Sequence, residues 1–253
     1  MKKRLTRSYI FMSFYNILKW YKNYPWYLKD FWYFRKQAKE KNHPLVKISD
    51  SFPCLTDKTS TTSFEPHYTY HPAWAARIVA AIKPKKHIDI SSVLHFSTLV
   101  SAFVPTEFYD YRPAHISLDN LVMGKADLVA LPFDNNSVES ISCMHTIEHV
   151  GLGRYGDPLD VDGDKKAAKE LARVVAPGGT FIFVAPVGKP RIEFNAHRIY
   201  SYEQVLELFP SLTLKEFSLV SDNFKETGLI KNAPKEIVAN QEWACGCFWF
   251  IKK

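Results

Sequence analysis

The chain has 253 residues and a mass of 29.2 kDa, which fits one α/β domain of ordinary size with a small appendage. Hydrophobic residues make up 46% of it and charged residues 23%, which excludes a disordered chain, a collagen and a coiled coil. No window reaches the roughly 18 uninterrupted apolar residues of a membrane span. The four cysteines are too few and too scattered for a disulfide framework or for a zinc site built from paired clusters, which favours a reducing cytosol.

Residues 1–40 predict a basic, aromatic, helical arm. Residues 1–36 hold 13 of the 37 aromatic residues, nine Lys or Arg and a single acid, Asp30, so this segment accounts for most of the net charge of +7. No small-residue cleavage site follows its short apolar stretch, so we do not expect a signal peptide. Trp and Tyr mixed with Lys and Arg are typical of a segment in a membrane interface. The arm is open to three interpretations: it binds a membrane surface or a partner, it packs on its own domain, or it binds nucleic acid. The lack of a basic excess in the rest of the chain argues against the last of these.

Residues 41–70 predict a linker or surface loop, because they are polar and contain three prolines and a Thr/Ser run. The domain that follows is expected to cover residues 71–253. Its first helix is predicted to begin at Pro72, a residue type that suits the first helical position, and to end before Pro84.

Strands and helices then alternate along the chain, which predicts an α/β domain with a Rossmann-like, mostly parallel sheet and helices on both faces. A capping box at Ser201 and Gln204 predicts a late helix that continues through Phe209. Asp162 or Asp164 is expected to cap an earlier helix, which Pro177 and two glycines end. The expected strands cover residues 87–91, 107–111, 126–130, 138–145 and 180–185, with an antiparallel pair at 212–221 and 243–251.

Polar residues follow several of these strands at the point where each strand ends. Ligands of such sheets bind outside the carboxyl ends of the strands, so these side chains are expected to border a cleft. They are Asp89, Ser91, Ser92 and His95 after the first strand, Asp110 and Arg112 after the second, Asp127 after the third, and His145, Glu148 and His149 after the fourth.

Several of these motifs resemble a known family. ADLVALPFD at 126–134, the strand at 138–145 and the segment from Glu170 to the Pro-Gly-Gly turn at 177–179 resemble the class I S-adenosylmethionine-dependent methyltransferases. A closer resemblance is to the bacterial family known as domain of unknown function 268. That family is methyltransferase-like and often associated with surface polysaccharide gene clusters. The strings that carry this second resemblance are SCMHTIEHVGLGRYGDPLD at 142–160, FYDYRP at 108–113 and FNAHRIY at 194–200.

The resemblance implies S-adenosylmethionine as cofactor. Asp110 has the position of the carboxylate that accepts hydrogen bonds from the ribose hydroxyls, and Asp127 with the backbone of Leu128 is expected to hold the adenine. The first turn, which should approach the methionine moiety, contains no glycine. The remaining residues expected at the cofactor are Asp89, Ser91 and Ser92 in that turn, and His145.

Methyl transfer to a hydroxyl also needs a base, and a neutral histidine is suited to that role near pH 7. His145 and His149 flank Glu148, and four residues apart they would share one helix face; all three are candidate catalytic residues, although either histidine alone is equally open to a buried structural role. No metal ion is expected, because the acidic loop from Asp157 to Asp164 lacks the glycine and the distal glutamate of a calcium loop; a divalent ion that assists a sugar diol is the open alternative. The residues expected to bind the acceptor are Arg154, Asp157, Asn195, His197 and Arg198.

The predicted function is therefore O-methylation of a sugar, free or lipid-linked, in bacterial surface polysaccharide synthesis such as that of O-antigen or capsule. The enzyme would be cytoplasmic, at most peripheral at the inner face of the membrane. The alternative is an inactive methyltransferase-fold scaffold that contacts the membrane or a glycosyltransferase through residues 1–40; the glycine-free first turn and the arm favour it. No nucleic acid partner is expected, because the core has no basic face.

Overall fold

The computed structural model describes residues 9–253, with the side chains of residues 17, 18 and 20–253. The chain divides into two units, Met1–Ser63 and Phe64–Lys253. The predicted arm lies in the first unit, and its residues 1–8 lie outside the described residues.

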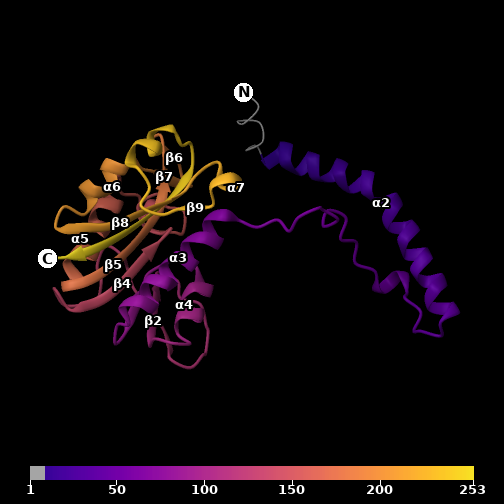
Figure 1. Ribbon diagram of the computed structural model, residues 1–253, viewed down its shortest axis with the longest axis horizontal. Coiled ribbons are helices and arrows are strands. Elements are labelled where there is room, and N and C mark those ends of the chain that lie inside the picture. The colour runs from indigo at the N-terminus through magenta and orange to yellow at the C-terminus, as the bar shows by residue number, and fades with distance from the viewer. Residues whose placement is uncertain (1–8) are drawn as a thin grey trace. The chain divides into compact units, whose positions relative to one another are not determined.

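The first unit is built on the long helix α2 (Tyr9–Glu40), as the sequence predicts for the arm (Figure 1). The segment after it contains only a short turn, η1 (Ile48–Asp50), and runs back along the helix. The Asn23 side chain donates a hydrogen bond to the carbonyl of Leu55 at 2.6 Å, and Lys58 lies 4.8 Å from the ring centre of Trp26. Across residues 9–253, no helix has the length and apolar character needed to cross a membrane.

The second unit contains an eight-stranded sheet in the order β3-β2-β1-β4-β5-β10-β8-β9. The strands β1 to β5 are parallel, and β10 runs antiparallel to both of its neighbours, as expected for residues 212–221 and 243–251. From β1 the chain adds β2 and β3 on one side, and it then adds β4 and β5 on the other side of β1. Ligands of folds in this class bind at the point between β1 and β4 where the strand order reverses in this way. The strands are β1 (His87–Asp89), β2 (Thr106–Asp110), β3 (Leu121–Lys125), β4 (Val138–Met144), β5 (Val175–Val187), β8 (Leu212–Val220), β9 (Leu229–Ile230) and β10 (Ala244–Lys252).

Helices cover both faces of this sheet (Figure 1). On β5, Phe181 and Phe183 pack in the cluster with α5 and α6, whereas Ile182 and Val184 pack in the cluster with α3 and α4. Alternate side chains of a strand point to opposite faces, so this strand is buried on both sides. The helices are α3 (Pro66–Ile82), α4 (Leu94–Val100), α5 (Gly163–Val174), α6 (Tyr202–Leu208) and the single turn α7 (Phe224–Thr227); η2 (Ile147–His149), η3 (Lys235–Asn240) and a hairpin of β6 (Arg191–Glu193) with β7 (His197–Ile199) complete the unit.

The capping box of α6 is present as predicted: the Ser201 hydroxyl accepts from the Gln204 amide, and the Gln204 side chain accepts from the Ser201 amide. The start of α3 was predicted wrongly. It lies at Pro66, within the predicted linker, because Glu65 accepts a hydrogen bond from the Tyr68 amide at 2.6 Å and caps the helix there. Pro72 lies inside the helix.

The third strand was also predicted at the wrong place. β3 covers Leu121–Lys125, and the residues after it form a turn in which the amide of Ala130 donates to the carbonyl of Asp127. The Asp127 side chain also accepts a hydrogen bond from the amide of Val129 at 3.1 Å. Asp side chains stabilise such turns in competition with strand pairing. Asp127 therefore still follows a strand, at the carboxyl edge of the sheet.

Candidate functional site

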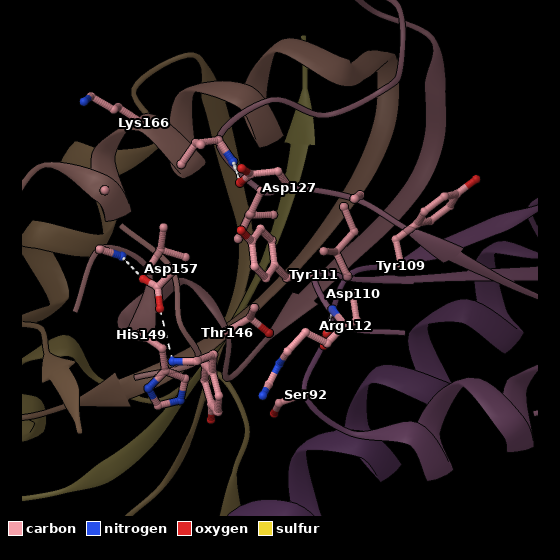
Figure 2. A pocket seen from close by; sticks show the side chains of 18 of the residues that line it. Ser92, Tyr109, Asp110, Tyr111, Arg112, Asp127, Thr146, His149, Asp157 and Lys166 are labelled. Carbon is pink, nitrogen blue, oxygen red and sulfur yellow. Dashed lines mark hydrogen bonds between the residues drawn. The ribbon is translucent and has the colours of Figure 1, made fainter. Parts of the chain in front are cut away.

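A cavity of about 430 Å³ lies at the carboxyl edge of the sheet, next to the reversal between β1 and β4. Its volume is in the range of pockets that hold small molecules and cofactors. The segments after β1, β2, β3 and β4 all contribute to its wall, as the sequence predicts for the residues that follow these strands. Figure 2 shows that side chains from these segments surround one hollow.

Two aspartates occupy neighbouring strand ends on this wall (Figure 2). Asp110 is the last residue of β2, and its Oδ1 accepts a hydrogen bond from the amide of Arg112 at 2.6 Å. This bond fixes the carboxylate and leaves Oδ2 for a ligand. Asp127 and Leu128 lie at the end of β3 beside it, because β2 and β3 pair in parallel. The structure thus brings together three of the residues expected at the cofactor.

The turn after β1 is held by a buried carboxylate. Asp89 is fully buried and accepts hydrogen bonds from the hydroxyls of Ser91, Ser97 and Ser142, the last at 2.6 Å. Burial raises the pKa of Asp89 to about 6, although the three hydroxyls act in the opposite direction. Ser91 also accepts from the amide of Met144. Asp89 and Ser91, both expected at the cofactor, therefore do not line the cavity, whereas Ser92 does.

The absence of glycine in this turn has a structural reason. Residues 90–93 have no positive φ angle, so the backbone there is open to any residue type. The amides of Ile90 and Ser92 bond to the carbonyls of Ser142 and Met144, so the turn simply extends the pairing of β1 with β4. Its conformation comes from hydrogen bonds rather than from glycine.

The segment after β4 differs from the prediction. His145 and His149 do not share a helix face, because His145 has φ 53° and only the single turn η2 follows. Both rings still lie against Glu148: Nδ1 of His145 donates to its Oε1 at 3.0 Å, and Nε2 of His149 lies 3.9 Å from the same oxygen. Burial alone raises the pKa of Glu148, but the hydrogen bond from His145 and the electrostatic influence of the two histidines outweigh it and hold that pKa below its usual value. Glu148 is 1% exposed and does not line the cavity, so it acts on its neighbours and not on a ligand directly.

His149 lines the cavity and has a defined tautomer. Its Nδ1 donates to the carbonyl of Ala196 at 2.6 Å, which leaves Nε2 as the nitrogen with a free lone pair. Arg154 donates to the same carbonyl at 3.1 Å and lies beside the ring of Tyr155, outside the cavity wall. Arg154 was expected to bind the acceptor, but in the structure it holds the loop through its bond to Ala196.

The loop after η2 is closed by Asp157. Its carboxylate accepts from the amides of Gly151 at 2.8 Å, Gly153 at 3.3 Å and Tyr155 at 3.2 Å, and it also borders the cavity. Burial alone raises the pKa of Asp157, but these amides outweigh it and lower that pKa. Asp157, which was expected to bind the acceptor, therefore holds the loop in place through these hydrogen bonds, from the side that faces the cavity.

The hairpin of β6 and β7 lies behind the wall instead of lining it. Asn195 is exposed at its turn, and the ring centre of His197 lies 6.3 Å from that of His149. Arg198 is buried and donates to the carbonyl of Val150 at 2.7 Å. Its guanidinium therefore stabilises the loop and is not available to an acceptor. The prediction that these three residues line the acceptor pocket therefore differs from the structure.

Sequence reasoning missed several residues of the wall. Tyr109 and Tyr111 flank Asp110, Thr146 lies within the predicted catalytic segment 145–149, and Tyr155 follows that segment. Their closeness in the sequence to predicted site residues is the signal that could have identified them. Lys166 reaches the wall from α5, where it pairs with Asp160 at 2.5 Å, and no local pattern marks it.

The family model described as "Caenorhabditis protein of unknown function, DUF268" matches residues 128–227. This description gives no support to a bacterial origin. No curated protein sequence matches the chain.

Solved structures resemble the chain more extensively. The YcgJ protein of Bacillus subtilis has a TM-score of 0.51 at 16% identity, and the match covers 73% of this chain and 99% of that one. The N-methyltransferase NodS of Bradyrhizobium japonicum, in complex with S-adenosylhomocysteine, has a TM-score of 0.51 at 11% identity over 73% and 87% of the chains. The 1,6-didemethyltoxoflavin N1-methyltransferase of Burkholderia thailandensis, with S-adenosylhomocysteine bound, has a TM-score of 0.52 at 10% identity over 77% and 93%. The second unit therefore has the Rossmann-like fold of the class I methyltransferases.

Proposed function

We propose that this protein is an S-adenosylmethionine-dependent methyltransferase. The observation that carries the proposal is the position of Asp110: its carboxylate ends β2, faces the cavity and keeps one oxygen for a ligand. A carboxylate held in this way can accept the two vicinal hydroxyls of a ribose, and bonds to a charged group contribute about 1.5–3 kcal/mol each.

The other residues of the wall are compatible with the rest of the cofactor. Asp127 and the backbone of Leu128 lie next to Asp110 and would hold the adenine edge. Ser92 and the turn it belongs to would border the methionine part, since that turn leads from β1 to the reversal point. The bound cofactor supplies a methyl group activated by a sulfonium; the protein has to hold the acceptor in line and remove its proton.

His149 is the base that this geometry favours. Its Nδ1 is engaged by the carbonyl of Ala196, so Nε2 can accept a proton from an acceptor hydroxyl in the cavity. Glu148 lies 3.9 Å from Nε2 and would stabilise the imidazolium that forms. Nε2 of His149 would take up the proton of the acceptor hydroxyl, and the cofactor would supply the methyl group and leave as the thioether S-adenosylhomocysteine.

The acceptor that we propose is a sugar hydroxyl, free or lipid-linked, in surface polysaccharide synthesis. This part rests on the resemblance of residues 142–160 and 194–200 to a family associated with such gene clusters. The wall also contains Tyr111, an aromatic residue of the kind that suits the apolar side of a sugar ring, whereas the ring of Tyr155 already lies against Arg112 and Arg154, at 4.8 and 5.1 Å.

The cofactor part is tested by calorimetric titration of the full-length protein with S-adenosylmethionine and S-adenosylhomocysteine. Asp110→Ala should weaken binding at least roughly tenfold, because one ribose contact to a charged group is worth about 1.5–3 kcal/mol. Asp119→Ala is the matched control, since this aspartate is exposed and outside the cavity wall, and it should bind as the parent does. Equal affinity in both variants, or no heat from a folded sample at millimolar ligand, contradicts the proposal.

The acceptor part needs its own assay. Transfer of labelled methyl groups to sugars, peptides and RNA should show activity on sugars alone, and His149→Ala should lower turnover about 10²- to 10⁴-fold with cofactor affinity unchanged. Transfer to peptide or RNA, with none to sugars, overturns the sugar assignment and leaves the methyltransferase assignment standing.

A membrane-surface role is a second candidate, and α2 favours it. Trp20, Tyr21, Trp32 and Tyr33 are exposed, and the helix contains several lysines but a single internal acid before its last residue. Aromatic rings and lysines together suit a layer of anionic headgroups at the inner face of the membrane. A scaffold role, with contact to a glycosyltransferase, would use the same surface. Sedimentation with anionic vesicles should pull down the full-length chain but not one that begins at residue 64; equal binding by both would discard the idea.

A further inference from the structure

A cluster of buried histidines and cysteines lies on the side of the sheet that α3 and α4 cover. His67 comes from the first turn of α3, His145 follows β4, and Cys245 lies near the start of β10. One potential ligand atom from each residue lies within 4.8 Å of the other two. None of the three residues is more than 4% exposed. The mechanism proposed above uses none of this cluster as a ligand for substrate.

The distances resemble those of a tetrahedral metal site. The Sγ of Cys245 lies 3.5 Å from Nε2 of His145. With bonds of about 2.3 Å to sulfur and about 2.0–2.1 Å to nitrogen, such ligands lie roughly 3.6 Å apart around a tetrahedral zinc ion. The Sγ of Cys247 lies 3.9 Å from that of Cys245, where the same geometry gives roughly 3.8 Å.

The hydrogen bonds around the cluster leave lone pairs directed into it. Nδ1 of His145 donates to Glu148, so Nε2 presents its lone pair toward Cys245. A histidine that donates its second nitrogen to a carboxylate is the usual arrangement at metal sites. Nδ1 of His67 and Nε2 of His71 are buried, and among the described residues neither has a hydrogen-bond partner. Buried polar atoms without partners are rare and call for an explanation.

We propose that His67, His145 and Cys245 bind a divalent transition-metal ion, of which zinc is the best match. Thiolate and imidazole ligands select zinc over magnesium and calcium. Binding replaces the S–H bond of Cys245 by a sulfur–metal bond and releases the proton to solvent. Cys247 and His71 are the nearby donors for a fourth position. The site does not depend on methyl transfer, but it explains why His149, and not His145, is left as the base.

The test uses the full-length protein after treatment with a chelator. Titration with Co²⁺ should produce a thiolate-to-cobalt charge-transfer band that saturates at one equivalent, and Zn²⁺ should displace the cobalt and raise the melting temperature. A folded sample that binds no Co²⁺ through sulfur overturns the proposal and leaves a plain Cys245–His145 hydrogen bond. Neither readout involves catalysis, so failure here and failure of the methyltransferase proposal are distinguishable.

Variants locate the ion. Cys245→Ser and His67→Gln should each weaken Zn²⁺ binding at least roughly 100-fold, and Glu148→Gln roughly 10- to 100-fold as a carboxylate that only orients a ligand. Cys143→Ser is the matched control, because this cysteine is equally buried but packs on the α5 side of the sheet. If Cys245→Ser and Cys143→Ser bind Zn²⁺ equally, with circular dichroism showing both folded, the site is not where we place it.

Discussion

The turn after β1 and the loop after β4 border the same cavity but are built in opposite ways. The first has no left-handed residue and takes its shape from the buried carboxylate of Asp89 and the serines around it. The second contains four left-handed residues, His145, Gly151, Gly153 and Gly156, and is closed by one carboxylate, that of Asp157. A cavity wall can therefore be shaped by hydrogen bonds or by backbone freedom. The first kind should be sensitive to the loss of a polar group, and the second to the addition of a side chain.

The largest effect is expected at Gly151. Its φ is 81°, and a Cβ there would lie 2.1 Å from the carbonyl oxygen of Asp160, so Gly151→Ala adds both strain and a backbone clash. We expect it to lower the free energy of unfolding by about 4 kcal/mol, more than the 1–3 kcal/mol of strain alone. Urea denaturation measures this. Gly156→Ala is the control, because φ is 84° but nothing lies within 4 Å of a Cβ there; if both cost the same, the close approach is irrelevant.

A smaller loss is expected when the carboxylate of the first turn is removed. Asp89→Ala leaves the hydroxyls of Ser91, Ser97 and Ser142 without their acceptor inside the protein. We expect a loss of about 3 kcal/mol in denaturation experiments, because each unsatisfied buried donor costs about 1–3 kcal/mol and some will find water. A loss below about 1 kcal/mol would mean that Asp89 does not hold the turn.

The pH dependence of stability should report the lowered pKa of His87, the first residue of the strand that leads into this turn. His87 is buried between the hydroxyls of Ser140 and Ser142, at 2.8 and 2.9 Å, and burial lowers its pKa to about 3. The unfolded chain therefore binds a proton at this residue between about pH 6.5 and pH 3 that the folded chain does not, so stability falls as the pH falls through this window. The difference in unfolding free energy between the parent and His87→Gln should shrink by about 2 kcal/mol from pH 7 to pH 5. An unchanged difference would show that His87 takes up its proton as readily in the folded protein as in the unfolded chain, and would contradict a lowered pKa.

The smallest effect is expected when a glycine is introduced into the turn after β1, which has none. Ser91→Gly removes the bonds to Asp89 and from the amide of Met144 and adds backbone freedom to the unfolded chain. We expect a loss of about 1–2 kcal/mol. A gain in stability would show that the turn is strained without glycine, which would reverse the comparison.

The sequence predicted the sheet better than the site. The runs at 87–91, 138–145, 212–221 and 243–251 are apolar and β-rich, and each forms a strand at about its predicted place. The run at 126–130 was predicted as a strand because its hydrophobicity was counted and the turn chemistry of Asp127 was not. Ala126 and Leu128 are buried and Asp127 between them is exposed, so this turn has the alternation of buried and exposed residues that a strand has.

The candidate site could be predicted only as far as its location. Residues that follow parallel strands must meet at one edge, so Asp110, Asp127 and His149 were identified from order alone. Whether a given side chain faces a ligand or the core depends on its hydrogen bonds, which is why Asp89 and Arg198 were assigned to ligands they do not face.

By itself the sequence determined the α/β class, the mostly parallel sheet, the capping box of α6 and the edge at which a ligand would bind, because these follow from local pattern and from the alternation of strands and helices. It did not determine the cap of α5, because Asp162 makes no capping hydrogen bond through its side chain. Only the tertiary structure decided which polar groups are used up inside the protein and which remain free. It also brought His67, His145 and Cys245 together from three distant segments, a meeting that no spacing in the sequence shows. The physical reason is that a buried polar group must find its partner in space, and partners in space are chosen by packing and not by sequence distance.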